Sequence, residues 1–375
     1  MISDMPRVVA KIDVDAITHN YKEIKKSIPR YTGIMAVVKA DAYGHGAVEI
    51  AKILQREEVD YLAVAITMEG AQLRDVGITT PILVLGYTPA ASVGVLIEND
   101  LTQTIFSYEM AKYISYEASK LEKKVKIHIK VDTGMGRIGF LPHPTSIEEI
   151  VEINKLPNIE IEGIYTHFSS ADEEDRTYTK KQNSIFNGFL KELEQVGIEV
   201  PIVHAANSAA IIMHPNTHSN MVRLGICLYG HYPSEVAKSY PVGLIPTMSL
   251  KTQVVHVKKV PKGQSIGYNR KYTTKHMTKI ATIPIGYADG YSRGLSNKGR
   301  VLIRGEYAPI IGNICMDQFM VDVTHINYVA VGDEVVLFGK QKGNEIAVEE
   351  IADILNTINY EIICMIGKRI PRIYV

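Results

Sequence analysis

The stretch Gly33-Ile-Met-Ala-Val-Val-Lys-Ala-Asp-Ala-Tyr-Gly-His-Gly46 contains the first unit of the pattern that decides the fold. An apolar run leads into a Gly/His/Gly turn, and the amphipathic segment Ala47–Arg56 follows directly. The same alternation of β-rich runs and segments of helical period continues along the chain. The β-rich runs are Ile34–Lys39, Tyr61–Ala65, Ile82–Leu85, Thr102–Phe106, Lys126–Val131, Ile159–His167, Ile202–Ala205 and Met221–Leu224. These eight candidate strands predict an α/β fold, a (β/α)8 TIM-like barrel, over residues 1–240.

Residues 241–375 follow a different pattern, which predicts a mostly β C-terminal domain. Turn residues separate its long alternating stretches, which are Met248–Val260, Lys279–Gly286, Arg300–Arg304, Ala308–Val323 and Glu334–Phe338. One clear helix, Val348–Asn356, precedes a final strand-like segment, Tyr360–Tyr374. A further strand-like run, residues 7–12, precedes the barrel pattern, and spacing leaves open whether it pairs with the second domain.

The size and charge of the chain limit the classes of function. Its 375 residues exceed the usual size of a single hydrophobic core, so two domains are expected. With 41 basic and 41 acidic side chains, the chain has no net field to attract nucleic acid or an anionic membrane. We therefore expect small molecules or further copies of the chain as partners.

The cysteines and the N-terminus indicate the compartment. Cys227, Cys315 and Cys364 form neither a metal-ligand pattern nor an even disulfide framework, so we expect free thiols and no bound metal. The start of the chain lacks a basic region followed by an apolar one, and no apolar run approaches membrane-spanning length. These features predict a soluble, cytoplasmic protein.

Lys39 is the most informative single residue because it ends an apolar run. An apolar site lowers the pKa of a lysine from about 10.4 and makes its amine a nucleophile that forms a Schiff base with an aldehyde. The alternative is a lysine whose stem covers apolar surface while its amine reaches water.

Other polar residues fall near the C-terminal ends of the candidate strands, where barrel enzymes place their catalytic groups. They are Arg137, His167, Asn207, Ser208, Arg223 and Gly225. Ser208 opens a helical run, Ser208–Met213, and a hydroxyl at a helix start can hold a phosphate. An ordinary helix N-cap is the alternative for Ser208.

Ordered motifs along nearly the whole chain resemble those of the pyridoxal phosphate (PLP)-dependent alanine racemases of fold type III. The motifs are Ala36-Val-Val-Lys-Ala-Asp-Ala-Tyr-Gly-His-Gly46, Lys130-Val-Asp-Thr-Gly-Met-Gly-Arg-Ile-Gly139, Thr166-His167, Ala206-Asn-Ser208, Arg223-Leu-Gly225, Ser265-Ile-Gly-Tyr268, Gly286-Tyr-Ala-Asp-Gly-Tyr291 and Gly312-Asn-Ile-Cys-Met-Asp317. The resemblance implies an isomerase that interconverts L-alanine and D-alanine and supplies D-alanine for peptidoglycan, the cell-wall polymer.

The resemblance assigns the two catalytic bases. It implies that Lys39 holds PLP (pyridoxal 5'-phosphate) as a Schiff base and exchanges a proton with one face of the substrate Cα. Racemisation removes a proton from one face and returns one to the other, so it needs a second group. The family pattern gives this role to Tyr268 of a partner subunit, which implies a homodimer with shared active sites.

The resemblance also assigns the cofactor contacts. It places Arg223 against the pyridine nitrogen, with His167 polarising the arginine. Because arginine does not give up a proton in practice, the ring becomes a weaker electron sink and transamination is discouraged. An arginine bridging barrel loops is the alternative. The phosphate contacts implied are Tyr43, Ser208, Tyr360 and the backbone amides of Gly225 and Ile226.

Further family positions concern the substrate. The resemblance implies that Arg137 contacts the phenolic oxygen of the cofactor and the substrate carboxylate, and that Lys130 matches a lysine carbamylated in several members. A strand lysine paired with a carboxylate is the alternative for Lys130. Substrate contacts implied for the partner are the amide of Met316 and the ring of Tyr287. We interpret His45, His128, His204 and Cys315 as structural.

Substrate choice and reaction class leave rival hypotheses. Tyr360 stands where serine-accepting racemases carry a smaller polar residue, which favours alanine modestly. The alternatives are a serine-preferring or broad amino-acid racemase, a PLP-dependent decarboxylase and a non-catalytic PLP-binding protein. Arg223 argues against the decarboxylase, and Tyr268 with the second domain argues against the binding protein. Lys368 replaces a tyrosine common in the family, and we expect it to alter local packing or the dimer edge and to leave the chemistry unaffected.

Overall fold

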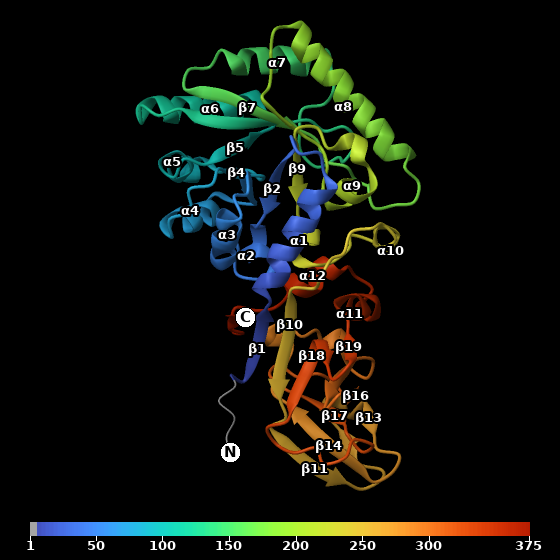
Figure 1. Cartoon of the computed structure of the whole chain (residues 1–375). Helices are drawn as coiled ribbons and strands as arrows, with labels where there is room; N and C mark the ends of the chain where they lie inside the picture. The colour runs from blue at the N-terminus through green and yellow to red at the C-terminus, as the bar shows by residue number, and fades with distance from the viewer. Residues whose placement is uncertain (1–5) are drawn as a thin grey trace. The chain divides into compact units, whose positions relative to one another are not determined.

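A computed structural model describes residues 6–375 of the chain, which form two compact units (Figure 1). The barrel unit contains Ala16–Ala42 and Gly46–Ile245. The C-terminal unit contains the described residues up to Asp15, together with Tyr43–His45 and Pro246–Val375. A three-residue piece of the first β/α loop thus belongs to the C-terminal unit.

The barrel unit is a closed ring of eight parallel strands with helices outside it, as the sequence predicts (Figure 1). The strands are β2 (Gly33–Val37), β3 (Tyr61–Val64), β4 (Ile82–Val84), β5 (Thr102–Ile105), β6 (Val125–Lys130), β7 (Ile159–Tyr165), β8 (Ile202–His204) and β9 (Met221–Leu224). The ring closes where β2 pairs with β9, with Met35 opposite Arg223. The catalytic end of such a barrel is the end at which its strands finish.

Helices connect the barrel strands and cover the ring. They are α1 (Val14–Ser27), α2 (Lys39–Tyr43), α3 (Ala47–Arg56), α4 (Thr67–Asp75), α5 (Ala90–Glu98), α6 (Tyr108–Lys120), α7 (Pro144–Asn154), α8 (Thr177–Gln195), α9 (Ser208–Met213) and α10 (Glu235–Lys238). In α3 the buried residues Ile50, Ala51 and Leu54 fall on one face, as helical period requires. Among residues 6–375 no helix combines the length and the apolar character needed to cross a bilayer.

Two predicted strands end two residues earlier than expected, and five others end one residue earlier. β2 ends at Val37, so Lys39 opens the following turn and is not the last residue of a strand. β7 ends at Tyr165, and His167 lies two residues beyond it. In both cases apolar or β-branched residues continue past the last ladder pair, so composition alone overestimates the strand.

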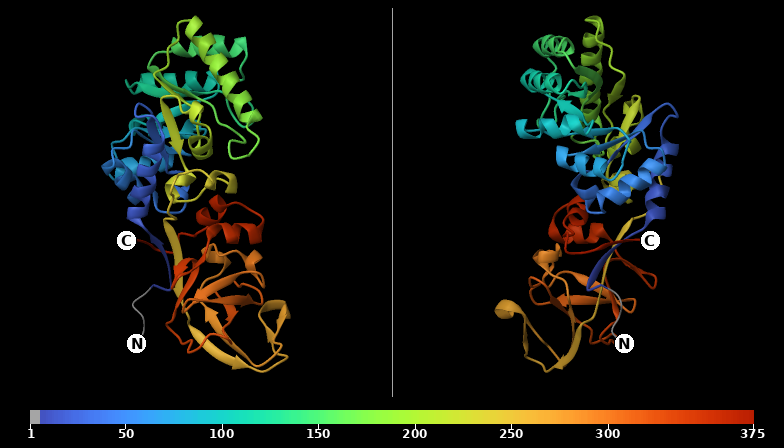
Figure 2. Two further views of the ribbon diagram at one scale, coloured as in Figure 1. Left: turned by 45° about the vertical axis from the view of Figure 1, so that its right-hand side comes forward. Right: turned by 90° about the vertical axis from the view of Figure 1, so that its left-hand side faces the viewer.

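The C-terminal unit, whose residues after 246 are coloured orange to red in Figure 2, is built on a ten-stranded sheet. Its strand order is β11-β14-β17-β16-β15-β18-β10-β1-β20, with β19 paired to β18. Its strands are β1 (Val8–Ile12), β10 (Met248–Gln253), β11 (His256–Val260), β14 (Thr278–Ile283), β15 (Arg300–Ile303), β16 (Glu306–Ile311), β17 (Phe319–Asp322), β18 (Glu334–Gln341), β19 (Asn344–Ile346) and β20 (Arg372–Tyr374). A separate hairpin joins β12 (Ser265–Ile266) to β13 (Tyr272–Thr273). The first strand of the chain, β1, pairs with β10 and β20 in this sheet.

The prediction of a strand over Tyr360–Tyr374 is wrong. The segment begins inside helix α12 (Asn359–Cys364), which follows α11 (Val348–Leu355), and only Arg372–Tyr374 form a strand. Ile362 and Ile363 are buried in α12, and a short apolar run of this kind suits a helix as well as a strand. Lys368 is exposed in the turn that connects α12 to β20.

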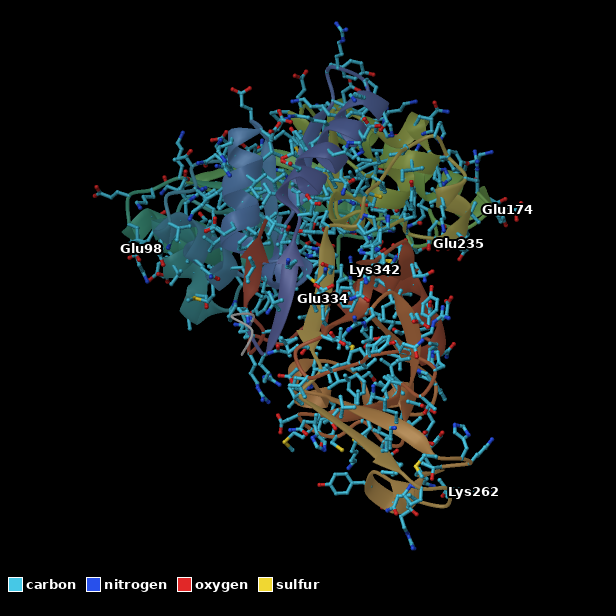
Figure 3. All side chains as sticks on the ribbon, turned by 60° about the horizontal axis from the view of Figure 1, so that its bottom comes forward. Glu98, Glu174, Glu235, Lys262, Glu334 and Lys342 are labelled. Atoms are coloured by element: carbon cyan, nitrogen blue, oxygen red, sulfur yellow. The ribbon has the colours of Figure 1, made fainter. Side chains whose placement is uncertain are left out.

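Charged side chains cover the surfaces of both units. Glu98, Glu174, Glu235 and Lys262 are exposed, and Figure 3 shows them at the outside of the ribbon. Side chains of both signs are interspersed, which agrees with the zero formal net charge. The described residues contain no cluster of three histidine, cysteine or acidic side chains that could hold a metal ion.

Candidate active site

Lys39 stands at the start of an unusual turn after β2. The four residues that follow it, Ala40 to Tyr43, all have left-handed backbone angles, with φ between 52° and 55°. Non-glycine residues pay about 1–2 kcal/mol each for this conformation, and such strain collects at functional sites. Within the barrel unit Glu69 holds the turn by accepting a hydrogen bond from the amide of Ala40 at 2.7 Å. Lys39 itself is half-buried, less than the sequence suggested.

Arg223 is the centre of a buried polar cluster at the end of β9. Only 4% of its surface is exposed. It donates to the ring nitrogens of His204 and His167, at 2.9 Å and 3.1 Å. Backbone oxygens accept its other hydrogen bonds, namely those of Thr166, His204 and Ala205. Within residues 6–375 Arg223 forms no ion pair with a carboxylate, and burial lowers its pKa to about 10.

His167 lies in a strongly positive environment. Burial and then the charges of Arg223, Arg137, Lys130 and Lys39 hold its pKa well below the usual range. The ring is therefore neutral, and because Arg223 donates to Nδ1, the ring proton must lie on Nε2. Four predicted site cations thus act on one histidine, so this part of the barrel favours an anionic ligand.

Lys130 is almost fully buried near the end of β6, with 2% exposure. Its amine donates to the carbonyl of Val131 at 2.7 Å and lies 5.5 Å above the ring of Tyr165. Burial and then the charge of Arg223 lower its pKa to about 7, although Asp132 opposes this. No ion pair to a carboxylate is present for Lys130 in the described part of the chain, so the alternative of a paired strand lysine does not hold.

Arg137 lies on a loop that Asp132 organises. The Oδ1 atom of Asp132 accepts from the amides of Gly134 and Gly136 at 3.0 Å and 3.1 Å. Gly139 has φ 134°, and a Cβ there would lie 2.6 Å from the amide nitrogen of Asp132. The loop therefore needs its glycines, and it leaves Arg137 exposed.

Ser208 and Gly225, which follow β8 and β9, are joined by a buried hydrogen bond. The hydroxyl of Ser208 accepts from the amides of Gly225 at 2.9 Å and Cys227 at 3.5 Å. The N-cap of α9 is Asn207, whose side chain accepts from the amide of Ala210 at 3.0 Å. The N-cap alternative for Ser208 is therefore wrong, because Asn207 has that task. Ile226 follows Gly225 and is fully buried.

The C-terminal unit holds five of the predicted site residues, in two groups. Tyr43 and Tyr360 face each other with ring centroids 6.1 Å apart. Gly44 is needed beside them, because it has φ 83° and a Cβ would lie 2.4 Å from the carbonyl oxygen of Ile363. This contact explains why a piece of the first β/α loop belongs to this unit.

The second group is exposed and consists of Tyr268, Tyr287 and Met316, which are 70%, 44% and 53% exposed. The amide of Tyr287 donates to the carbonyl of Cys315 at 3.1 Å, so the two loops adjoin. The side chain of Asn313 donates to the carbonyl of Tyr268 at 2.9 Å. Because Asn313 is close in sequence to Cys315 and Met316, this bond holds Tyr268 near the same loop. Three separate motifs thus meet at one surface of the C-terminal unit.

Two histidines without a predicted role belong to the Arg223 cluster. His204 contacts Arg223, and its Nε2 lies 2.9 Å from Nδ1 of His128. Their spacing along the chain gave no reason to connect them with Arg223. One feature of the sequence could have indicated their role: a histidine stands between apolar residues within a predicted strand, as in Ile127-His-Ile129. His45 instead bonds to Thr247 within the C-terminal unit. The three cysteines are free thiols, as expected.

Comparison with known proteins identifies the family. The model of the alanine racemase N-terminal domain matches residues 12–233, and that of the C-terminal domain matches residues 247–374. Alanine racemase of Methanococcus maripaludis is 54% identical over 365 residues, covering 97% of this chain and 98% of that protein.

Solved structures agree over the full length. Alanine racemase of Clostridium difficile 630 superposes with a TM-score of 0.96 at 46% identity, covering 100% of this chain and 97% of that chain. Alanine racemase of Bacillus anthracis, with bound L-Ala-P, gives a TM-score of 0.93 at 41% identity and covers 100% and 96%. With both domains matched and full-length relatives of this similarity, the chain belongs to the alanine racemase family.

Proposed function

We propose that the chain interconverts L-alanine and D-alanine with PLP held by Lys39, and that it supplies D-alanine for peptidoglycan. The observation that carries the proposal is the buried Arg223, whose partners are two histidines and three carbonyl groups, with no carboxylate among the residues that the structure describes. A PLP enzyme that pairs the ring nitrogen with a carboxylate builds a stronger electron sink. The surroundings of Arg223 suit the weaker sink that a racemase needs.

The residues of the barrel fit this cofactor. Ser208 and the amide of Gly225 supply a hydroxyl and a backbone donor that suit a phosphate. The cations that act on His167 favour an anion in the same region. By the family pattern Tyr43, Tyr360 and the amide of Ile226 complete the phosphate contacts, and Arg137 takes the phenolic oxygen.

The chemistry divides between cofactor and protein. When bound, PLP withdraws electrons from the substrate Cα, so that its proton becomes removable. The amine of Lys39 accepts or returns that proton on one face, and the phenol of Tyr268 from a second copy of the chain acts on the other. Two carriers are required because one group cannot reach both faces of a planar carbon. The function therefore requires a homodimer.

Arg223 decides which reaction follows. A guanidinium has only N–H donors and keeps its proton, so it can hydrogen-bond to a ring nitrogen without protonating it. With its ring nitrogen unprotonated, bound PLP would be a weaker electron sink, which would favour return of the proton to Cα, and hence racemisation over transamination. His167 accepts from Arg223 and keeps the guanidinium in this orientation.

Lys130 is proposed to carry a carbamate that orients Arg137. Its pKa of about 7 leaves a large neutral fraction at neutral pH, and a neutral amine is the form that adds carbon dioxide. A carbamate would also place a negative charge among the surrounding cations. Isotopically labelled bicarbonate should give a carbamate signal that is lost in Lys130→Met and kept in Lys126→Met.

Four residues are proposed to select the substrate. The amide of Met316 and the guanidinium of Arg137 bind the carboxylate, and Tyr287 narrows the entrance. L-Ala-P in the Bacillus anthracis relative is a small molecule of the expected class. Tyr360 limits the room beyond the methyl group, which favours alanine over serine.

The decisive experiment is detection of D-alanine formed from L-alanine with D-amino-acid oxidase. The purified dimeric protein should be yellow, and activity should run in both directions. L-serine, ornithine and diaminopimelate serve as comparison substrates. Faster racemisation of serine, or release of carbon dioxide from the diamino acids, would replace the proposal by one of its alternatives.

A further inference from the structure

A line of hydrogen-bonding side chains runs through the barrel interior from Arg223 to Glu162. Arg223 Nη1 lies 2.9 Å from Nδ1 of His204, and Nε2 of His204 lies 2.9 Å from Nδ1 of His128. Nε2 of His128 then lies 3.4 Å from Oε2 of Glu162, an ion-pair distance longer than an ideal hydrogen bond. Both imidazoles are completely buried. The line thus leads from the arginine at the end of β9 to a carboxylate in β7.

The chemistry of the two end groups fixes the direction of the two hydrogen bonds in the line, and the 3.4 Å approach of His128 Nε2 to Glu162 is an electrostatic contact without hydrogen-bond geometry. Arg223 can only donate, so Nδ1 of His204 must accept, and the proton of that neutral ring lies on Nε2. This proton points to Nδ1 of His128, which accepts in turn and carries its own proton on Nε2. That proton faces the carboxylate of Glu162, which can only accept.

Both rings are neutral. Burial, followed by the charge of Arg223, holds the pKa of His204 well below its ordinary value. Burial also lowers the pKa of His128, although Glu162 opposes the shift. Two neutral rings between a cation and an anion form a polarised chain, in which each hydrogen bond strengthens the next.

Glu162 is held as a carboxylate at the far end. Burial raises its pKa, but the contact with His128 and the hydrogen bonds from Lys126 and Tyr61 outweigh this effect and lower the pKa to about 2. Lys126 donates to Oε1 and the hydroxyl of Tyr61 donates to Oε2, both at 2.7 Å. The carboxylate of Glu162 is therefore ionised near neutral pH, and its two hydrogen bonds hold it in place.

The backbone makes room for the line. A Cβ at Gly163 would lie 2.6 Å from three ring atoms of His128, so only glycine leaves space for the imidazole. The ring of Tyr165 stacks on His204 with centroids 4.6 Å and planes 10° apart. Arg223 lies over the same tyrosine, 5.1 Å from its ring centroid. Packing thus fixes both imidazoles.

We propose that Glu162, acting through His128 and His204, is a positioning residue for Arg223. The carboxylate compensates the buried guanidinium from a distance, so that no negative charge lies beside the arginine itself. The line also fixes the orientation of the guanidinium, and so determines which of its N–H groups bond to the protein and which can bond to a ligand. The inference rests on the proposed function only in taking the ring nitrogen of PLP as that ligand.

The test measures the tautomers of the two rings in the full-length protein. Histidine labelled with heavy nitrogen shows by NMR which ring nitrogen carries a proton. In the unmodified protein, His128 and His204 should both be protonated at Nε2 and bare at Nδ1. Protonation of either ring at Nδ1 would overturn the proposal, and this measurement needs no variant.

Glu162→Gln removes the charge at nearly constant shape, and Glu160→Gln is its control, because Glu160 is an exposed glutamate in the same strand. In Glu162→Gln the Nε2 preference of His128 should be lost and the signal of His204 should shift. Glu160→Gln should leave both rings unchanged. Unchanged ring signals in a folded Glu162→Gln protein would overturn the relay.

Turnover supplies a second readout. In Glu162→Gln, kcat for alanine should fall roughly tenfold with KM nearly constant, as expected when a group that orients a functional side chain is lost. A rise in KM with unchanged kcat would contradict a positioning role. If the unmodified protein does not racemise alanine at all, the proposed function fails, while the tautomer measurement still decides the relay.

Discussion

The polar cluster around Arg223 in the barrel unit is buried, whereas one group of predicted site residues in the C-terminal unit is exposed. Arg223 and Lys130 are buried and make hydrogen bonds inside the barrel. Tyr268, Tyr287 and Met316 share one surface and expose roughly half or more of their area. Exposed aromatic and methionine side chains gathered in this way are typical of interaction surfaces. The difference supports the proposed division of labour, in which the barrel of one chain would bind the cofactor and a partner subunit would supply the exposed residues that contact the substrate.

Removing the barrel nucleophile should have the largest effect. Lys39→Ala should reduce D-alanine formation by at least about 10⁴-fold, because both cofactor attachment and proton transfer are lost. Borohydride should fix PLP on the unmodified chain and not on this variant. Lys52→Ala, at a half-buried position in α3 where the lysine pairs with Glu49, is the control and should behave as the unmodified chain. A cofactor adduct on Lys39→Ala would contradict the assignment.

Removing the hydroxyl group of Tyr268 tests the proposed second base, which lies in the C-terminal unit. Tyr268→Phe should keep PLP but lose about 10²–10⁴-fold in activity, chiefly in the direction in which tyrosine abstracts the proton. Solvent deuterium incorporation measured separately from each enantiomer would show the asymmetry. The exposed Tyr328 provides a matched control, Tyr328→Phe. Full activity in both directions would exclude Tyr268 as the second base.

Arg223, the centre of the buried cluster in the barrel, is proposed to set reaction specificity. Arg223→Lys keeps a positive charge but removes the planar guanidinium, whose N–H groups donate hydrogen bonds to His204, to His167 and to three backbone carbonyls. We expect kcat to fall by about 10²-fold, and the share of transamination, followed as pyruvate release, to rise. An unchanged ratio of pyruvate to D-alanine would show that Arg223 does not decide the reaction.

The burial of Lys130 predicts a pH-dependent stability. Its pKa is about 7 in the folded protein against an ordinary value of 10.5, so from pH 7 to 8.5 only the unfolded chain binds the proton. Stability in carbonate-free buffer should therefore rise with pH, by about 1 kcal/mol per unit from this group. Urea unfolding of Lys130→Met should lack this contribution. Equal slopes for the two proteins would contradict the low pKa.

Tyr360 is expected to have the smallest effect. Tyr360→Ser should raise the ratio of serine to alanine turnover by only a few-fold, because an apolar pocket rejects an added hydroxyl weakly. Tyr374→Phe, in the same unit, should leave the ratio unchanged. A loss of alanine activity without a change in the ratio would indicate that Tyr360 matters mainly for the cofactor.

Sequence patterns predicted the barrel because each of its strands is a short apolar run next to an amphipathic helix. Their ends were less certain, as β2 and β7 show, since apolar residues continue beyond the ladder. Helix α12 was mistaken for a strand because six residues give too little periodicity to distinguish the two.

The parts of the site that could not be predicted depend on three-dimensional packing. The left-handed turn after Lys39 contains no glycine before Gly44, so nothing local signals it. Glu69, which holds the turn, comes from another β/α unit. His128 and His204 are 76 positions apart and meet only because β6 and β8 face each other inside a closed ring. The motif residues could be identified by resemblance, but not the groups that support them.

The placement of β1 has a consequence for synthesis of the chain. This strand, made first, lies between β10 and β20, which are made after the whole barrel. A fragment limited to residues 241–375 would leave the pairing edges of β10 and β20 without their shared neighbour, and such open edges aggregate. β1 can therefore meet both of its sheet partners only after residues 372–374 have been added to the growing chain.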